Sequence, residues 1–120
     1  MLKYQTKGGV TMLNQVVLVG RLCRKPEIME TDSGKKRTYI TLAVPRSFKN
    51  TNGEYETDFL DCILWDNVAT STVEYCNKGD IVGVKGRLQS RTVEEDSKRK
   101  TVTSIVAEKV TFLTSKSKED

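Results

Sequence analysis

The sequence predicts an all-β domain with one short helix. Most of the 120-residue chain consists of short apolar runs in which β-branched residues are frequent or apolar and polar residues alternate. Turn signals containing Gly, Asn and Asp separate these runs. One stretch, after Asp66, has apolar residues at helical spacing instead. The length is that of a single domain.

The first strand is expected from Val16 to Leu22, a β-branched run that ends in Gly-Arg-Leu. Pro26 interrupts the pattern, because proline cannot donate to a strand ladder. Glu27 to Thr31 then resumes as a short edge segment, and Asp32-Ser33-Gly34 marks a turn.

The second long strand is predicted from Arg37 to Val44, where side chains alternate between two faces. One face carries Ile40, Leu42 and Val44, and the other carries Tyr39, Thr41 and Ala43. The Asn52-Gly53 pair is a strong turn signal. The second and third strands should therefore form a hairpin.

The third strand, Thr57 to Trp65, has two chemically different faces. Alternation places Leu60, Cys62 and Leu64 on one face and Phe59, Asp61, Ile63 and Trp65 on the other. The wholly apolar face is the candidate for the core, because burying Asp61 without a partner would be costly. Phe59 and Trp65, the single tryptophan of the chain, are then left on the face away from the core.

Aromatic residues in strands are often packing residues, so Phe59 and Trp65 also fit a loop contact or a subunit contact. The charge distribution favours a ligand. Eight basic and three acidic residues lie from Arg21 to Lys49, and six basic and three acidic residues lie from Lys85 to Lys100. Residues 50–80, by contrast, contain one basic and seven acidic residues. Rings flanked by cations are typical of a platform for single-stranded nucleic acid.

Asp66 is the predicted N-cap of a helix that runs to about Cys76, with Gly79 as its C′ residue. Its apolar stripe comprises Val68, Ala69, Thr72, Val73 and Cys76. A fourth strand follows from Asp80 to Leu88, then a charged hairpin over residues 89–100 and a fifth strand over residues 101–113.

This order of strands and helix is that of the OB-fold, a five-stranded Greek-key barrel. We assign the barrel to residues 12–113, a disordered extension to residues 1–11 and a short charged tail to residues 114–120. The Lys-Gly-Gly before Met12 is also what a translated ribosome-binding site would encode, which would make Met12 the true start.

Several classes of function are disfavoured. The chain has no histidine, no nucleophile elbow and no phosphate-binding glycine loop, so we expect no enzyme. Its three cysteines lack zinc-site spacing, and we expect no cofactor and no metal. No segment is typical of a membrane span or a secretory signal, so a cytoplasmic, nucleoid-associated protein is expected.

Several segments in register resemble the bacterial single-stranded DNA-binding protein family. They are residues 12–22, Pro26-Glu27, residues 40–44, the segment from Asp58-Phe59 through Leu64-Trp65, residues 78–80 and residues 84–88. The resemblance implies a homotetramer whose first strand helps to pair subunits, and it places stacking positions on Phe48, Phe59 and Trp65. A fourth stacking position falls on Val93, which has no ring. The family's long tail with an acidic tip is not matched, so recruitment of replication enzymes is doubtful.

We therefore expect binding of single-stranded DNA with little sequence preference, in replication, recombination or repair. The residues assigned to phosphates are Lys36, Arg37, Arg46, Lys49, Lys85, Arg87, Arg91, Lys98, Arg99 and Lys100. The alternatives are a primosomal or RNA-binding OB-fold protein and a structural assembly subunit.

Overall fold

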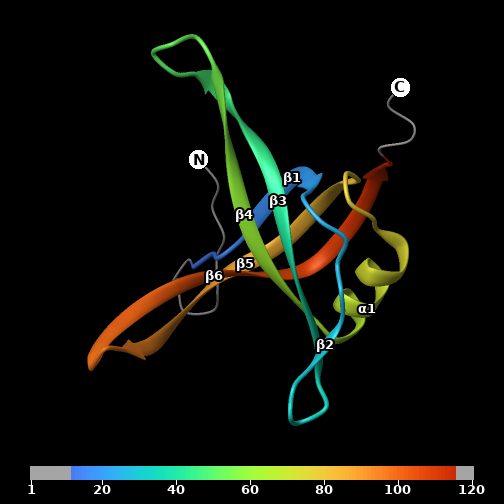
Figure 1. Ribbon diagram of the computed structural model, residues 1–120, viewed down its shortest axis with the longest axis vertical. Coiled ribbons are helices and arrows are strands. Elements are labelled where there is room, and N and C mark those ends of the chain that lie inside the picture. The colour runs from blue at the N-terminus through green and yellow to red at the C-terminus, as the bar shows by residue number, and fades with distance from the viewer. Residues whose placement is uncertain (1–11, 116–120) are drawn as a thin grey trace.

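The computed structural model describes residues 12–115, so the predicted disorder of residues 1–11 and the last five residues of the tail lie outside the described part. The elements are β1 (Val16–Leu22), β2 (Met29–Glu30), β3 (Lys36–Lys49), β4 (Tyr55–Trp65), α1 (Asp66–Tyr75), β5 (Ile81–Glu95) and β6 (Lys98–Thr114). The mostly-β class with one helix is confirmed (Figure 1).

Five strands close a barrel. The order of hydrogen-bonded neighbours is β1-β5-β6-β4-β3, and the end of β1 returns to β3, where Arg21 pairs with Ala43 and Leu22 with Leu42. All of these pairs are antiparallel except β4 and β6, which run parallel. The two-residue β2 adds only a short edge to β3. This closed arrangement is the predicted five-stranded OB-fold barrel.

Two hairpins extend beyond the barrel, the β3–β4 arm and the β5–β6 arm (Figure 1). β3 and β5 have 14 and 15 residues, so both are longer than their apolar patterns predicted. The β3–β4 arm turns at Asn50, whose side-chain oxygen accepts hydrogen bonds from the backbone N–H groups of Asn52 and Glu54 at 2.9 and 3.0 Å. The β5–β6 arm turns at Asp96 and Ser97, which both have positive φ, as in the mirror-image turns that suit the twist of hairpins.

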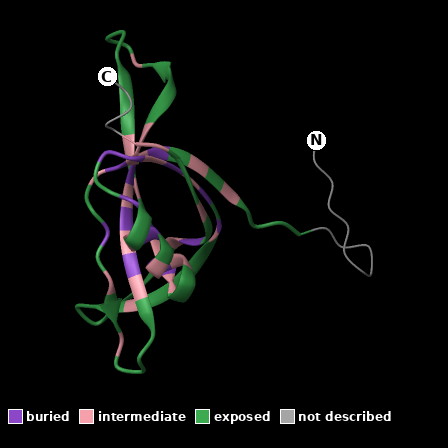
Figure 2. Cartoon of the chain, turned by 90° about the vertical axis from the view of Figure 1, so that its right-hand side faces the viewer, coloured by how far each residue is buried: buried purple, intermediate pink, exposed green. Residues whose placement is uncertain are grey.

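The core fills the barrel and leaves both arms exposed (Figure 2). Its buried apolar side chains come from every long strand and from the helix and the turn after it: Leu22, Ile40, Leu42, Cys62, Leu64, Ala69, Cys76, Val82, Val84 and Ala107. Within a strand, the side chains that enter the core mostly lie at alternate positions, because successive side chains of a strand point to opposite faces. The inward placement of Cys62 and Leu64 in the third strand is thus confirmed.

The helix α1 follows β4 and packs Ala69 and Thr72 into the core. The predicted capping was wrong. The helix begins at Asp66 with Trp65 in the N-cap position, and no side chain caps it. Asp66 has a φ of 49°, so the backbone turns sharply where the strand becomes the helix.

Gly79 is not the C′ residue of the helix, because the helix ends at Tyr75 with Cys76 as its C-cap. Gly79 lies in the next turn, where its φ is 91° and its N–H donates to the carbonyl oxygen of Leu22 at 2.9 Å. The Arg21 guanidinium donates to the Gly79 carbonyl oxygen at 2.7 Å. This glycine therefore joins the turn after the helix to β1.

Candidate nucleic-acid interface

The outer and inner faces of β4 differ in solvent exposure, as the alternation predicts. Phe59 is 66% exposed and Asp61 is exposed, whereas Cys62 and Leu64 are fully buried. Trp65 is half-buried, so this ring has only part of its surface free. One face of β4 thus belongs to the core and the other faces solvent.

The antiparallel register places β3 side chains beside those of β4 on the same outer face. Ala43 lies opposite Phe59, Tyr39 opposite Ile63, and Arg37 opposite Trp65. The Arg37 guanidinium carbon lies 5.7 Å from the centre of the Tyr39 ring. We call this outer surface of β3 and β4, residues 35–49 and 55–65, the β3–β4 face.

Two further cations lie over rings of this face. The Lys35 ammonium is 5.8 Å from the centre of the Trp65 ring, at the barrel end. The Lys49 ammonium is 5.6 Å from the centre of the Tyr55 ring, on the arm. Lys49 and Tyr55 are also partners in the register. A cation therefore lies over each of three rings of this face, and such a surface offers both rings for stacking and cations for phosphates.

Asp61 lies in the middle of the β3–β4 face. Its carboxylate accepts a hydrogen bond of 2.5 Å from the Thr41 hydroxyl, its partner across the ladder. The Thr41 hydroxyl is a neutral donor, so this contact does not cancel the charge of the carboxylate. The negative charge of Asp61 therefore remains on the face and disfavours a phosphate beside it.

Arg46 is engaged by two acids of β4. Its Nη2 donates to Asp58 at 3.0 Å and its Nη1 donates to Glu56 at 3.0 Å. This guanidinium lowers the pKa of the Asp58 carboxyl, chiefly through the hydrogen bond, and the two acids raise the pKa of Arg46. Asp58 shares the parity of Leu60 in the alternation, so the cluster lies on the face opposite Phe59. Arg46 is thus the least available of the predicted phosphate contacts.

Phe48 is 67% exposed and lies in the bulged part of β3 between Pro45 and Lys49. Two extra residues of β3 are accommodated there, opposite a shorter segment of β4. The bulge locally bends the arm and changes the direction of its side chains. Phe48 is therefore an exposed ring, carried on the arm and away from the barrel.

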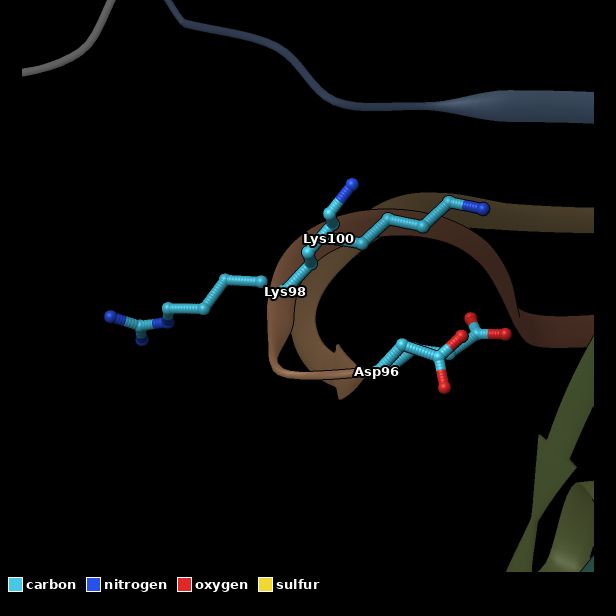
Figure 3. Close-up of a pocket in the computed structure, with 5 residues that line it drawn as sticks. Asp96, Lys98 and Lys100 are labelled. Carbon is cyan, nitrogen blue, oxygen red and sulfur yellow. The ribbon is translucent and has the colours of Figure 1, made fainter.

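The tip of the β5–β6 arm gathers three cations. A shallow hollow of about 410 Å³ is lined by Glu95, Asp96, Lys98, Arg99 and Lys100. In Figure 3 the ammonium groups of Lys98 and Lys100 lie on one side of the turn and the carboxylate of Asp96 on the other. Lys98, Arg99 and Lys100 are exposed, as is Arg91 on the same arm.

Lys85 and Arg87 lie elsewhere, on the outer wall of the barrel. Lys85 is opposite Val17 of β1 and Lys109 of β6. Arg87 donates to Gln89 at 2.7 Å and lies 3.7 Å from a Glu108 oxygen. Lys36 is exposed and lies opposite Glu30 in the register of β3 with the short strand β2. The predicted phosphate residues therefore fall on several surfaces instead of one.

Two of the three cysteines, Cys62 and Cys76, are buried and take no part in this interface. Burial raises the pKa of the Cys62 thiol to about 11, and burial also raises the pKa of the Cys76 thiol. Both are therefore thiols at neutral pH and unreactive packing groups. No cluster of three metal-ligating side chains occurs within residues 12–115, and no helix in that range has the length and apolarity to cross a membrane.

Three residues of the β3–β4 face were missed as candidates from the sequence: Lys35, Tyr39 and Tyr55. Tyr39 carried a usable signal, since the alternation had placed it on the face opposite Ile40. Lys35 and Tyr55 carried none, because both lie next to turns whose geometry decides which ring or cation they meet.

Comparison with known proteins gives a consistent result. The model of the single-strand binding protein family matches residues 13–113. The chain is 46% identical over 109 residues to single-stranded DNA-binding protein B of Bacillus subtilis, a match that covers 90% of this chain and 96% of that protein. It is 49% identical over 106 residues to single-stranded DNA-binding protein 3 of Listeria innocua, where the match covers 88% of this chain and 66% of the relative.

Among solved structures, a deletion mutant of the single-stranded DNA binding protein from Thermus aquaticus superposes with a TM-score of 0.72 at 27% identity. The match covers 87% of this chain and 52% of the Thermus chain. The likeness extends over most of the chain, so it supports the OB-fold assignment independently of the strand order.

Proposed function

The chain belongs to the single-strand binding protein family, and on that premise we propose that it binds single-stranded DNA with little sequence preference. The observation that carries this proposal is the set of rings along the β3–β4 face, three of which have a cation over them. Rings stack on any base, because every base has a π-face. Such a surface needs no base-specific hydrogen bonds, and we propose binding without catalysis.

In this proposal the bases stack on Phe59 and Trp65, and on Phe48 where the strand passes along the arm. Each stack is worth roughly 1–3 kcal/mol. Phe59 offers the largest free ring surface next to the barrel, since it is 66% exposed. Trp65 offers part of its ring once Lys35 moves aside. We infer that the two rings do most of the binding.

Phosphates are held by cations of the face and by the tip of the β5–β6 arm. Asp61 keeps its charge in the central row, so we infer that the DNA backbone runs to the side of that row. Arg37 and Lys49 lie on the face itself, and the tip of the β5–β6 arm presents Lys98, Arg99 and Lys100. Arg46 is left out of this set, because its guanidinium is already paired with Asp58 and Glu56 on the opposite face.

We also propose a homotetramer in which β1 pairs subunits. Residues 16–20 of β1 pair with β5 on one side, and the β1–β3 pairs are confined to Arg21 and Leu22. The outward side chains of this segment, Val17 and Val19, are 67% and 53% exposed. An edge strand with exposed apolar residues is a template for pairing with another chain. Sedimentation of a Val19→Lys variant tests this, since a dissociated protein is expected.

The proposed role is protection of single-stranded DNA during replication, recombination or repair at the nucleoid. An RNA-binding or primosomal role and a purely structural role are the alternatives that the binding experiment separates.

The test is titration of the protein with single-stranded DNA, RNA of matched sequence and duplex DNA, monitored by Trp65 fluorescence. Because the chain has one tryptophan, the signal reports on this ring alone. We expect strong quenching by single-stranded DNA, weaker binding of RNA and poor competition by duplex. Equal affinity for duplex would refute the proposal, RNA preference would favour the RNA-binding alternative, and unchanged fluorescence without binding would favour a structural role.

A further inference from the structure

The β3–β4 face contains a ring between Phe59 and Trp65 to which no role has been assigned. Tyr39 lies in the register row of Ile63, two residues from the row of Trp65 and four from that of Phe59. At about 3.4 Å per residue these rows are about 7 and about 14 Å away along the strands. Of the residues that form the interval between the two rings, Tyr39 is the only aromatic one, beside Thr41, Asp61 and Ile63.

The ring of Tyr39 is covered by a cation. The guanidinium of Arg37, two residues along the same strand, lies 5.7 Å from its centre. Arg37 is itself opposite Trp65, whose ring is covered by Lys35 in the same manner. A cation over an accessible ring is held by about 0.5–1 kcal/mol, so a base that stacks more strongly can displace it.

Two polar groups at this place have no partner within residues 12–115. The Tyr39 hydroxyl makes no hydrogen bond to a described residue and is not enclosed. The Nε of Arg37 is buried and has no hydrogen-bond partner in the same range. A buried donor without a partner is unfavourable, and a phosphate oxygen that reached it would satisfy it. Ring and cation are therefore arranged for a ligand that has both a π-face and an anionic group.

We propose that Tyr39 is a further base-stacking position, and that Arg37 moves from its ring to the phosphate of the stacked nucleotide. This inference rests on the proposed binding of single-stranded DNA and specifies the path of the strand. The DNA crosses from β4 at Phe59 to β3 at Tyr39 and returns to β4 at Trp65. That path passes beside Asp61 without placing a phosphate on it.

The test is the affinity for a fluorescently labelled oligothymidine, measured by anisotropy for Tyr39→Leu and Tyr39→Phe. Leucine keeps apolar bulk without a π-face, and we expect it to weaken binding by roughly five- to 150-fold, the range for one lost stack. Phenylalanine keeps the ring and should bind within about twofold of the unaltered protein, because the stack is retained. Tyr75→Leu is the matched control, because Tyr75 is 69% exposed on α1, away from this face, and its loss should leave affinity unchanged.

The salt dependence separates stacking from an indirect effect on Arg37. A ring releases no counterions, so Tyr39→Leu should keep the slope of log affinity against log salt. A smaller slope would mean that the lost affinity belonged to a displaced Arg37, and it would overturn the stacking role. A lower melting temperature of Tyr39→Leu with unchanged affinity would make Tyr39 a packing residue and also overturn it.

A direct readout is available in the double variant Trp65→Phe, Tyr39→Trp, whose single tryptophan reports on position 39. Quenching by oligothymidine is expected, and unchanged fluorescence on binding would contradict the inference. The two proposals fail separately. An unaltered protein that does not bind oligothymidine would refute the proposed function, whereas normal binding that Phe59→Ala weakens and Tyr39→Leu does not would refute only the role of Tyr39.

Discussion

Arg46 and Asp58 hold each other across the β3–β4 arm, with the guanidinium Nη2 3.0 Å from a carboxylate oxygen and Nε within 3.3 Å of both oxygens. A guanidinium in this fork-like contact is a geometric match for a carboxylate, and it is therefore a poor binding site for a phosphate from elsewhere. The sequence assigned this arginine to DNA, and the structure gives it two protein partners, Asp58 and Glu56.

The first prediction concerns the titration of Asp58. Because Arg46 lowers the pKa of this carboxyl, Arg46→Gln should raise that pKa toward its ordinary value, as measured by NMR titration of the side chain. A folded-state pKa below the unfolded value contributes stability that is present above the unfolded value and is lost as pH falls through the lowered one. Any stabilisation by this pair should thus fade only in acid. An Asp58 titration that is identical in the variant would contradict the contact.

The second prediction concerns the tip of the β5–β6 arm. Replacing Lys98, Arg99 and Lys100 by Ala should reduce the magnitude of the slope of log affinity against log salt by about 2, at roughly 0.7 per phosphate contact on a single strand. Arg46→Gln is the comparison, because its charge is already paired and its loss should change the slope little. If the triple variant keeps the full slope, the arm tip remains in solvent when DNA binds.

The third prediction separates the two faces of β4. Phe59→Ala should lower affinity by roughly five- to 150-fold and change the melting temperature little, since this ring is 66% exposed. Leu64→Ala should do the reverse, because its side chain is fully buried and truncation of such a leucine costs about 2–5 kcal/mol. Trp65 is half-buried, so Trp65→Ala should lose both affinity and some stability.

Thermal denaturation and oligonucleotide titration on the three variants give the measurement. A Phe59→Ala protein that melts earlier and binds normally would show that the binding face has been placed on the wrong side of the strand.

The fourth prediction concerns the close approach of β5 and β6. A Cβ at Gly86 would collide with the backbone carbonyl of Val106, at a bulge of the ladder. Neither backbone can move without opening the barrel wall, so Gly86→Ala should destabilise by at least about 1–3 kcal/mol. Gly83→Ala is the matched control on the same strand, where the nearest atom, Leu113 Cδ1, would be 3.8 Å away. Denaturant unfolding of the two variants at the same protein concentration gives the comparison. Equal unfolding midpoints would contradict this account.

The barrel strands were predictable because each has one face in the core. Val16–Leu22 was predicted with its observed bounds, and the alternation in residues 57–65 assigned Leu64 and Phe59 to opposite faces. A strand with one face in the core needs an apolar side chain at every second position, and this alternation can be read directly from the sequence. The turn at Asn52-Gly53 was equally predictable from its residue types, and Gly53 indeed has a positive φ of 79°.

The arms and the contacts between side chains were less predictable. Residues 46–49 of β3 and most of residues 89–95 of β5 are exposed, so no hydrophobic period marks them as strand. The partners of Arg46 depend on the bulge between Pro45 and Lys49, which no local pattern indicates. The start of the helix was misassigned because Asp66 has the residue type of an N-cap, whereas the helix begins at Asp66 itself and no side chain caps it.

The exposure of the β5–β6 arm has a consequence for its motion. Beyond Leu88 both of its faces are largely in solvent, so its ladder of hydrogen bonds holds it with little support from buried apolar contacts. Segments of that kind open by local fluctuation at a small fraction of the free energy of global unfolding. Backbone amides of the arm should therefore exchange with deuterium far faster than those of Val82 and Val84 in the barrel wall. A bound strand that contacts the tip would have to suppress this opening, so part of the binding free energy is consumed in ordering the arm.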